Sequence, residues 1–295
     1  MQRERRNPLY LSAFPLPDRV TALADLGKAV DGATMVVLAV PSEGLPETCR
    51  QLANCLAPGP GVVSAAKGLE HGTGRRLSEV MGESLGQGRR IAVLSGPNLA
   101  PEVAAGTATA SVVASPDYAF AAEVQAVFST PRFRVYTNPD VVGVELGGAL
   151  KNIIAIGAGA SDGLGFGDNT KAALMTRGLA EMTRLGVMLG ASAETFRGLS
   201  GMGDLIVTCA GSKSRNHHVG YELARGRQLN EILAEMGGQV AEGIETTRAA
   251  MRLSQQTGTD MPIAAAVYAT LFEGMPPREA VRNLMTRAWR DEMEG

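Results

Sequence analysis

The 295-residue sequence predicts an α/β domain with a parallel sheet, followed by an all-α domain. Two observations predict this order. Between Thr34 and Thr137, short apolar runs alternate with stretches of helical pattern, and after Thr137 the strand signals stop. The length suits two domains of roughly 100–200 residues each.

Four apolar runs in the first half are the predicted strands. Each is continuous rather than alternating, as expected for a strand that helices cover on both faces. The predicted strands are 34–40, 61–66, 91–94 and 111–114, and the predicted helices between them are 45–56, 73–84 and 117–128. Repeated strand–helix units with right-handed crossovers predict a parallel sheet with helices on both sides.

The second half contains helical patterns separated by glycine-rich turns. The predicted helices are 140–159, 170–189, 215–225, 242–257 and 263–272. Pro139 disfavours helix at Asn138, and its own fixed φ suits the first turn of a helix. We therefore expect a sheet domain over 1–138 and an all-helical domain over 139–295.

Composition and charge exclude several classes of protein. Lys and Arg number 28 against 30 Asp and Glu, and this balance argues against a nucleic-acid or membrane-surface binder. No apolar run approaches the ~18–20 residues that span a bilayer, and no apolar segment follows the charged start. Three cysteines without a CxxC pair fit a reducing compartment. We expect a cytoplasmic protein without nucleic-acid or membrane partners.

Polar residues follow two of the predicted strands. In a parallel sheet, ligands bind outside the carboxyl ends of the strands. Lys67 follows one strand, and Gly96 and Asn98 follow the next. Gly96 permits close backbone approach, and Asn98 is suited to cap the next helix. The alternatives are a solvated lysine and an ordinary helix cap.

The apolar helix around Lys151 is more informative. Gly147 and Gly148 lie one turn before this lysine, and each glycine costs about 1 kcal/mol relative to alanine, so we expect close packing there. Gly148 shares a face with Lys151. A lysine on such a helix should point into a cleft rather than be wholly buried. The alternative is a lysine whose ammonium reaches solvent along the surface.

Two later segments carry polar groups. Asp204 lies at a predicted helix start with Thr208 one turn later, and its alternative role is an N-cap. The turn 212–216 precedes another helix. If Ser214 caps that helix, its first N–H groups and Arg215 can converge on a phosphate; the alternative is a basic surface turn. The pair His217-His218 lacks further ligands at metal spacing, so we expect no metal site.

At these same positions the sequence resembles the bacterial type of NAD(P)-dependent glycerol-3-phosphate dehydrogenase. Each matching fragment is short, but their ordered set is specific and covers nearly the whole chain. The fragments are 66–70, 95–98, 145–152, 161–169, 203–208, 214–216 and 240–243. The resemblance implies a partial dinucleotide-binding domain of the Rossmann type over 1–138, followed by an all-helical domain over 139–295 that binds the substrate and carries the catalytic residues.

The resemblance also implies roles for individual residues. Lys151 matches the catalytic lysine and Asp204 the carboxylate beside it. The matches to substrate contacts are Lys67, Gly96, Asn98, Lys151, Asp204, Thr208, Ser214, Arg215 and Asn216, of which the last two match the phosphate clamp. The matches to cofactor contacts are Lys67, Ala100, Arg215, Val240 and Glu242. Asn98 departs from the Ser or Thr that bacterial members more often carry.

One expected motif is absent from the sequence. Such enzymes open with a strand, a GxGxxG turn and a helix, in which backbone N–H groups hold the pyrophosphate of the cofactor. No Gly-x-Gly triplet here has Gly or Ala at the sixth place. We therefore expect that roughly 30–45 residues, about one βαβ unit, are lacking. The chain as written should then fold poorly or bind nicotinamide nucleotide weakly, and NAD cannot be told from NADP.

The implied reaction interconverts dihydroxyacetone phosphate and sn-glycerol 3-phosphate, which would supply glycerophospholipid synthesis. Lys151 would protonate the developing alkoxide, and a free lysine pKa near 10.4 with Asp204 alongside would keep it charged. One alternative is a related hydroxyacid dehydrogenase of the same architecture. The other is an inactive truncated remnant that acts only as a binding protein. The sequence does not fix the oligomeric state, and a homodimer stays open.

Overall fold

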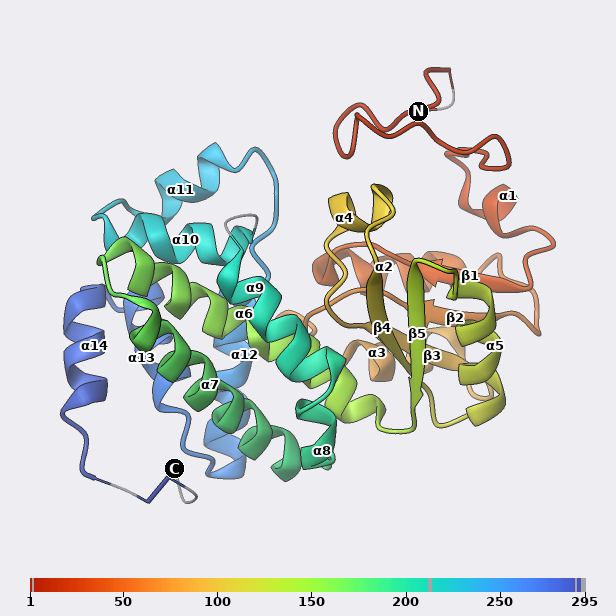
Figure 1. Cartoon of the computed structure of the whole chain (residues 1–295). Coiled ribbons are helices and arrows are strands. Elements are labelled where there is room, and N and C mark those ends of the chain that lie inside the picture. Colours follow the sequence, from red (N-terminus) through yellow and green to blue (C-terminus); the bar gives the residue numbers. More distant parts are fainter. Residues whose placement is uncertain (2, 212–213, 290, 293–295) are drawn as a thin grey trace.

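The computed structural model describes residues 1, 3–211, 214–289 and 291–292. Ser212 and Lys213, part of the turn that the sequence places before Arg215, lie outside the described residues. Figure 1 shows a sheet-containing half beside a helical half, with one long helix, α6, running from their junction into the helical half.

Five strands form one sheet in the order β1-β2-β3-β4-β5. The first four lie at predicted positions. Their bounds are β1 (Met35–Leu38), β2 (Gly61–Ser64), β3 (Ile91–Ser95), β4 (Thr109–Ala114) and β5 (Phe133–Asn138). Strands β1, β2 and β3 are parallel, and so are β4 and β5, which makes the sheet predominantly parallel.

The predicted parallel arrangement is wrong at one pair, because β4 runs antiparallel to β3 with Val93 opposite Ala114. The connection between them contains only helix α4 (Ala100–Ala104). A five-residue helix rises about 7.5 Å and β3 spans about 17 Å, so this connection is not the long helical crossover that joins neighbouring parallel strands. The chain therefore reverses direction at this connection.

Strand β5 was not predicted. Its burial alternates: Val135 is buried, whereas Arg134 and Tyr136 are exposed. This pattern is typical of a strand with one solvated face, at the edge of a sheet. A search for continuous apolar runs does not find such a strand.

Helices cover both faces of the sheet, as predicted. On one face, α2 (Leu45–Ala53) and α3 (Leu77–Leu85) pack on the first strands together with α1 (Leu26–Val30). On the other face α5 (Tyr118–Phe128) packs its Phe120 over the middle strands. The outer strand β1 is an exception to double coverage, because Val37 is 42% exposed.

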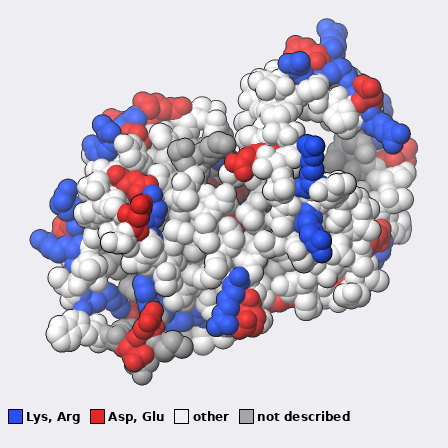
Figure 2. All heavy atoms as spheres, viewed as in Figure 1, with Lys and Arg blue, Asp and Glu red and all other residues white. Residues whose placement is uncertain are grey.

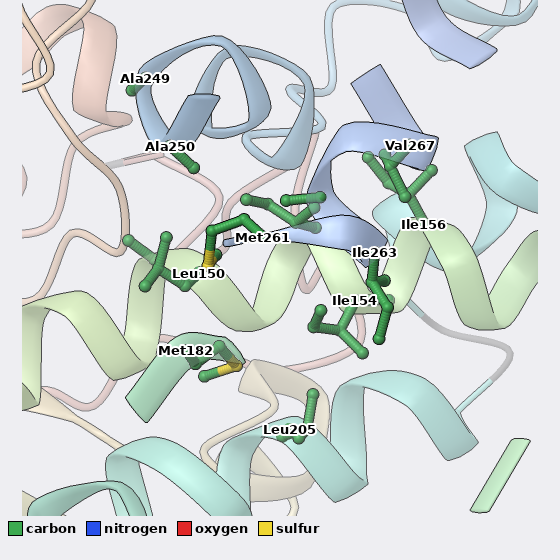
Figure 3. Close-up of a cluster of buried hydrophobic side chains, with 14 of the residues drawn as sticks. Leu150, Ile154, Ile156, Met182, Leu205, Ala249, Ala250, Met261, Ile263 and Val267 are labelled. Atoms are coloured by element: carbon green, nitrogen blue, oxygen red, sulfur yellow. The ribbon is translucent and has the colours of Figure 1, made fainter. Parts of the chain in front are cut away.

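The helical half begins with α6 (Val141–Gly163), and the five helices predicted there are all present. The other elements are α7 (Asp168–Met188), α8 (Ala193–Phe196), η2 (Leu199–Gly203), α9 (Asp204–Ala210), α10 (Arg215–Ala224), α11 (Leu229–Glu235), α12 (Gly243–Thr257), α13 (Pro262–Phe272) and α14 (Pro277–Met285). Their shared core surrounds α6: Figure 3 shows Leu150 and Ile154 of α6 among Met182, Leu205 and Met261 from other elements.

The expectation that no apolar segment is long enough to span a bilayer is wrong for helix α6. By length and composition alone it could cross a membrane, but 83% of its most apolar window is buried inside the fold. It is therefore the core helix of the helical half. Asp140 caps its first turn by accepting a hydrogen bond from Gly143 N at 2.8 Å, so the helix begins after Pro139 rather than at it.

Glycines allow α6 and α10 to cross in direct backbone contact. A Cβ on Gly159 would lie 1.9 Å from the carbonyl oxygen of His217, and one on Gly220 would lie 1.9 Å from that of Ile156. No side chain fits in either gap. The two helices are consequently held at a fixed separation, and the start of α10 is fixed relative to α6.

Candidate active site

The carboxyl ends of β1, β2 and β3 lie at one edge of the sheet because these strands are parallel. Lys67 follows β2 at this edge, and its ammonium donates hydrogen bonds to Gly96 O (2.8 Å) and Asn98 Oδ1 (2.6 Å), which both follow β3. The structure therefore brings these three residues together. Asn98 does not cap α4, because its Nδ2 faces Ser111 Oγ at 3.3 Å and Leu99 takes the N-cap position.

Gly96 is at this edge for a steric reason. Its φ is +128°, and a Cβ there would lie 3.1 Å from the backbone of Ser111. Glycine alone combines this backbone conformation with such a close approach. The prediction of close backbone approach at Gly96 is confirmed.

Helix α6 supplies Lys151, whose side chain is only 7% exposed. Its ammonium donates to Thr208 Oγ1 at 2.7 Å and forms an ion pair with Asp204 Oδ1 at 2.6 Å. The expectation that Lys151 is open to a cleft is wrong in this structure. A buried ammonium is tolerated here because a carboxylate and a hydroxyl replace the water that it has lost.

Asp204 joins the two lysines. Its Oδ1 pairs with Lys151, and its Oδ2 lies 3.1 Å from the ammonium of Lys67 without an aligned hydrogen bond among the described residues. The side chain is 2% exposed, and Gly203 takes the N-cap position of α9, so the capping alternative for Asp204 is wrong. One buried carboxylate thus bridges the sheet half and the helical half.

Burial lowers the pKa of Lys151 from 10.5 to about 8. Loss of hydration is the largest cause; the charge of Lys67 acts in the same direction, whereas Asp204 opposes both. The expectation that Asp204 keeps this lysine at its ordinary pKa or above is therefore wrong. An amine with this pKa exchanges protons readily near neutral pH.

The paired glycines of α6 mark the contact between the two halves. A Cβ on Gly148 would lie 2.6 Å from Ser95 Oγ and 3.6 Å from Lys67 Cγ, and one on Gly147 would lie 2.9 Å from Ser200 O. The predicted close packing is confirmed. It places Lys151, one turn after Gly148, against the strand ends that carry Lys67.

The first turn of α10 contacts the part of α6 that carries Lys151. Ser214 caps this helix, as the sequence predicts, by accepting a hydrogen bond from His217 N at 3.2 Å. Arg215 is exposed. Asn216 is buried, and its Nδ2 donates a hydrogen bond to Asn152 Oδ1 at 2.9 Å. The residue that follows Arg215 therefore contacts the residue that follows Lys151.

Asn152 was missed by the sequence reasoning. It follows Lys151 directly and is 5% exposed inside an apolar helix. The same hydrogen-bonded chain continues to α12, because Asn216 Oδ1 accepts from Gly243 N at 2.9 Å. A second buried polar residue in so apolar a helix was the available signal.

The residues proposed for the cofactor are more dispersed. Glu242 accepts a hydrogen bond from Ser42 N at 3.2 Å, which joins α12 to the end of β1 through η1 (Ser42–Gly44). Burial raises the pKa of Glu242, while Ser42 and the charges of Arg215 and Lys151 lower it. Ala100 is exposed at the start of α4, and Val240 is half-buried before α12.

The site fits one end of a nicotinamide cofactor together with a small anionic substrate. Two ammonium groups and an amide suit a carbonyl oxygen or an anion, and Asp204 Oδ2 and Ser95 Oγ are buried without hydrogen-bond partners among the described residues. The pyrophosphate would need a glycine-rich strand–helix turn, and none of the Gly-x-Gly triplets of this sequence forms one.

The surface supports a site at the junction of the two halves. Figure 2 shows a hollow between them on the face in view, with acidic atoms in its floor and groups of both signs scattered elsewhere. On this face the basic residues do not form a continuous tract.

Comparison with known proteins gives consistent matches. Residues 1–121 match the family "NAD-dependent glycerol-3-phosphate dehydrogenase N-terminus", and residues 140–282 match the corresponding C-terminus. The chain is 48% identical to glycerol-3-phosphate dehydrogenase [NAD(P)+] of Geobacillus kaustophilus, covering 100% of this chain and 86% of that protein. It is 51% identical to that of Desulfitobacterium hafniense, covering 100% and 83%.

A solved structure agrees with these matches. The glycerol-3-phosphate dehydrogenase of Coxiella burnetii superposes with a TM-score of 0.93 at 40% identity, covering 97% of this chain and 87% of that one.

Proposed function

The chain belongs to the NAD-dependent glycerol-3-phosphate dehydrogenase family, and we propose that it interconverts dihydroxyacetone phosphate and sn-glycerol 3-phosphate with NAD(H) or NADP(H). The observation that carries this proposal is the buried Lys151–Asp204 pair, which lies against Lys67 at the ends of the parallel strands. We assign the sheet domain to 1–138 and the domain that completes the site to 139–295.

Lys151 handles the proton in this proposal. A bound nicotinamide ring would supply or accept the hydride at C2 of the substrate. In the reductive direction the Lys151 ammonium gives a proton to the C2 oxygen, and Asp204 with Thr208 holds that ammonium in place. In the oxidative direction the neutral amine takes the proton back.

Lys67 and the start of α10 position the substrate. Lys67, with Gly96 and Asn98 around its ammonium, would hold the polar end of the substrate near the sheet. Arg215 and Asn216 would hold the phosphate, because a guanidinium at a helix N-terminus is suited to an anion. Ser214 fixes the backbone of this turn by capping it. Ala100, Val240, Glu242, Lys67 and Arg215 would contact the cofactor.

The cellular setting follows from the reaction. We propose a cytoplasmic enzyme that supplies glycerophospholipid synthesis, works without nucleic-acid or membrane partners, and assembles as a homodimer.

The test is a spectrophotometric assay of NADH and NADPH consumption with dihydroxyacetone phosphate, and with unphosphorylated dihydroxyacetone as the matched substrate. We expect turnover of the phosphorylated ketone and at least a hundredfold lower kcat/KM for the other, the scale of a lost charged interaction of about 3 kcal/mol. A phosphate-free carbonyl substrate that is reduced as well as dihydroxyacetone phosphate would favour the alternative dehydrogenase. Nucleotide binding without turnover of either would favour the remnant.

A further inference from the structure

Glu145 is a buried carboxylate outside the site described above, and it connects the two halves of the molecule. It lies in the second turn of α6, and its side chain is 4% exposed. All hydrogen-bond partners of its side chain among the described residues come from the sheet half, 67 to 69 residues away in sequence. An anion this deeply buried is stable only when such partners surround it.

Those partners belong to the start of α3. Glu145 Oε1 accepts from Ser78 N at 2.8 Å, and Oε2 accepts from the Ser78 hydroxyl and lies 3.1 Å from Arg76 Nη1. Ser78 N is among the first N–H groups of α3, which have no partner inside the helix. The carboxylate of one half therefore completes the helix start of the other.

The start of α3 is connected in turn to Lys67. The loop 67–76 is braced internally: Leu69 pairs with Arg76, and Glu70 N donates to Arg75 O at 2.9 Å. Arg75 also pairs with Glu70 at 2.8 Å. This bracing joins residues 69–70 to residues 75–76, and so connects the end of the loop that Glu145 holds to the segment that follows Lys67.

We propose that Glu145 is a positioning residue that sets the separation between the ammonium of Lys67 and that of Lys151. Lys151 lies six residues further along the same helix, about 9 Å along its axis. A helix is rigid over this length, so fixing the Lys67 loop at Glu145 fixes it relative to Lys151. This inference rests on the proposed function, because it assigns the spacing of two groups within that site.

The pH dependence of the reaction reports this separation. The groups that act on Lys151 are Asp204, Lys67, Cys209 and Glu242. Of these, Lys67 lies on the loop that Glu145 holds, and its positive charge lowers the pKa of Lys151. If that loop moves away, the pKa of Lys151 rises.

The experiment compares Glu145→Gln with Ser78→Ala and with Glu79→Gln as the control. Glu79 pairs with the same Arg76 at 2.5 Å but belongs to α3, and it has no hydrogen bond or ion pair to α6 among the described residues. The measurements are the pH profile of glycerol 3-phosphate oxidation, KM for dihydroxyacetone phosphate, and Tm. Ser78→Ala changes no charge and keeps the backbone hydrogen bond to Glu145, so it serves if Glu145→Gln does not fold.

We expect Glu145→Gln to raise the midpoint of the increase in oxidation rate with pH by about half a unit to one unit, the scale produced when a neighbouring charge moves by an ångström or two at an effective dielectric constant of about 20. KM should rise about three- to tenfold, with the plateau kcat within about threefold. Ser78→Ala should shift the midpoint in the same direction by less, and Glu79→Gln should leave it unchanged.

The sign of the shift separates positioning from simpler effects. Direct loss of a negative charge near Lys151 favours the neutral amine, and would lower the midpoint instead. An unchanged or lowered midpoint in either variant, with Tm showing a folded protein, would overturn the proposal. Failure of the proposed function is distinguishable, because it appears as absent turnover in the wild-type chain.

Discussion

Two ammonium groups share the carboxylate of Asp204, and the regions that present them differ. Lys151 comes from the middle of a buried core helix, and its side chain is 7% exposed. Lys67 comes from a loop at the strand ends, and its side chain is 19% exposed. Helix α6 holds the ammonium of Lys151 away from water, and this burial lowers its pKa. The strand edge leaves the ammonium of Lys67 more accessible to a ligand. This difference supports our proposal that Lys151 transfers the proton and Lys67 binds the substrate.

The largest expected effect comes from removing the buried group. Lys151→Ala should lower kcat for dihydroxyacetone phosphate reduction by about 10²- to 10⁴-fold, the usual contribution of a positioned acid. The exposed Lys28→Ala variant is the control, and steady-state kinetics at saturating cofactor is the measurement. Near-normal kcat would remove the distinction between the two lysines.

Removing the accessible group should act mainly on binding. Lys67→Met should raise KM for dihydroxyacetone phosphate about ten- to hundredfold, as expected for loss of a charged hydrogen bond of about 1.5–3 kcal/mol. The kcat value should fall less than in Lys151→Ala. A fall of equal size in kcat, with KM unchanged, would show that Lys67 shares the proton step.

The pH dependence sharpens the comparison further, because burial lowers the pKa of Lys151 to about 8. Oxidation needs the neutral amine, so its kcat should rise as pH increases through about 8. Reduction needs the ammonium, so its kcat should fall over the same range. The measurement is kcat against pH in both directions.

The matched variant for this profile is Lys151→Arg. A guanidinium stays protonated throughout this range, so oxidation should be low and without the rise near pH 8. Persistence of the rise in this variant would assign it to another group.

The sequence predicted much of the fold and the identity of both lysines, but not their different environments. Long helices and four strands carry strong local patterns. The direction of β4 depends on how far the preceding connection reaches, and β5 alternates because one of its faces is solvated. Neither the direction of β4 nor the alternating burial of β5 can be predicted from a continuous apolar run.

The pKa of Lys151 could not be predicted without the three-dimensional structure. Lys151 and Asp204 are 53 positions apart, and the pKa of the lysine depends on how completely α6 is covered. The resemblance implied a carboxylate beside Lys151, but loss of hydration affects the pKa of this lysine more than that carboxylate does. The links from Glu145 to Ser78 and from Asn152 to Asn216 are likewise tertiary contacts without a local pattern.

The smallest expected effect lies where the two regions touch. In Gly148→Ala, the added methyl group would lie 2.6 Å from Ser95 Oγ and 3.6 Å from Lys67 Cγ. Alanine favours helix over glycine by about 1 kcal/mol, while overpacking costs about 1–3 kcal/mol. Tm should therefore fall by a few degrees at most, while displacement of Lys67 raises KM about two- to fivefold.

Gly157→Ala is the matched control on the same helix. Its methyl group would meet Leu174 at 3.4 Å, an ordinary contact, and lies away from both lysines. The helix preference then dominates, and Tm should rise by about 2–4 °C with KM unchanged. Thermal unfolding and KM for dihydroxyacetone phosphate, measured on both variants, check this. If Gly148→Ala changed Tm and KM no differently from Gly157→Ala, then close packing at Gly148 would not hold the strand edge against the helix, and the accessible lysine would be placed by its own loop alone.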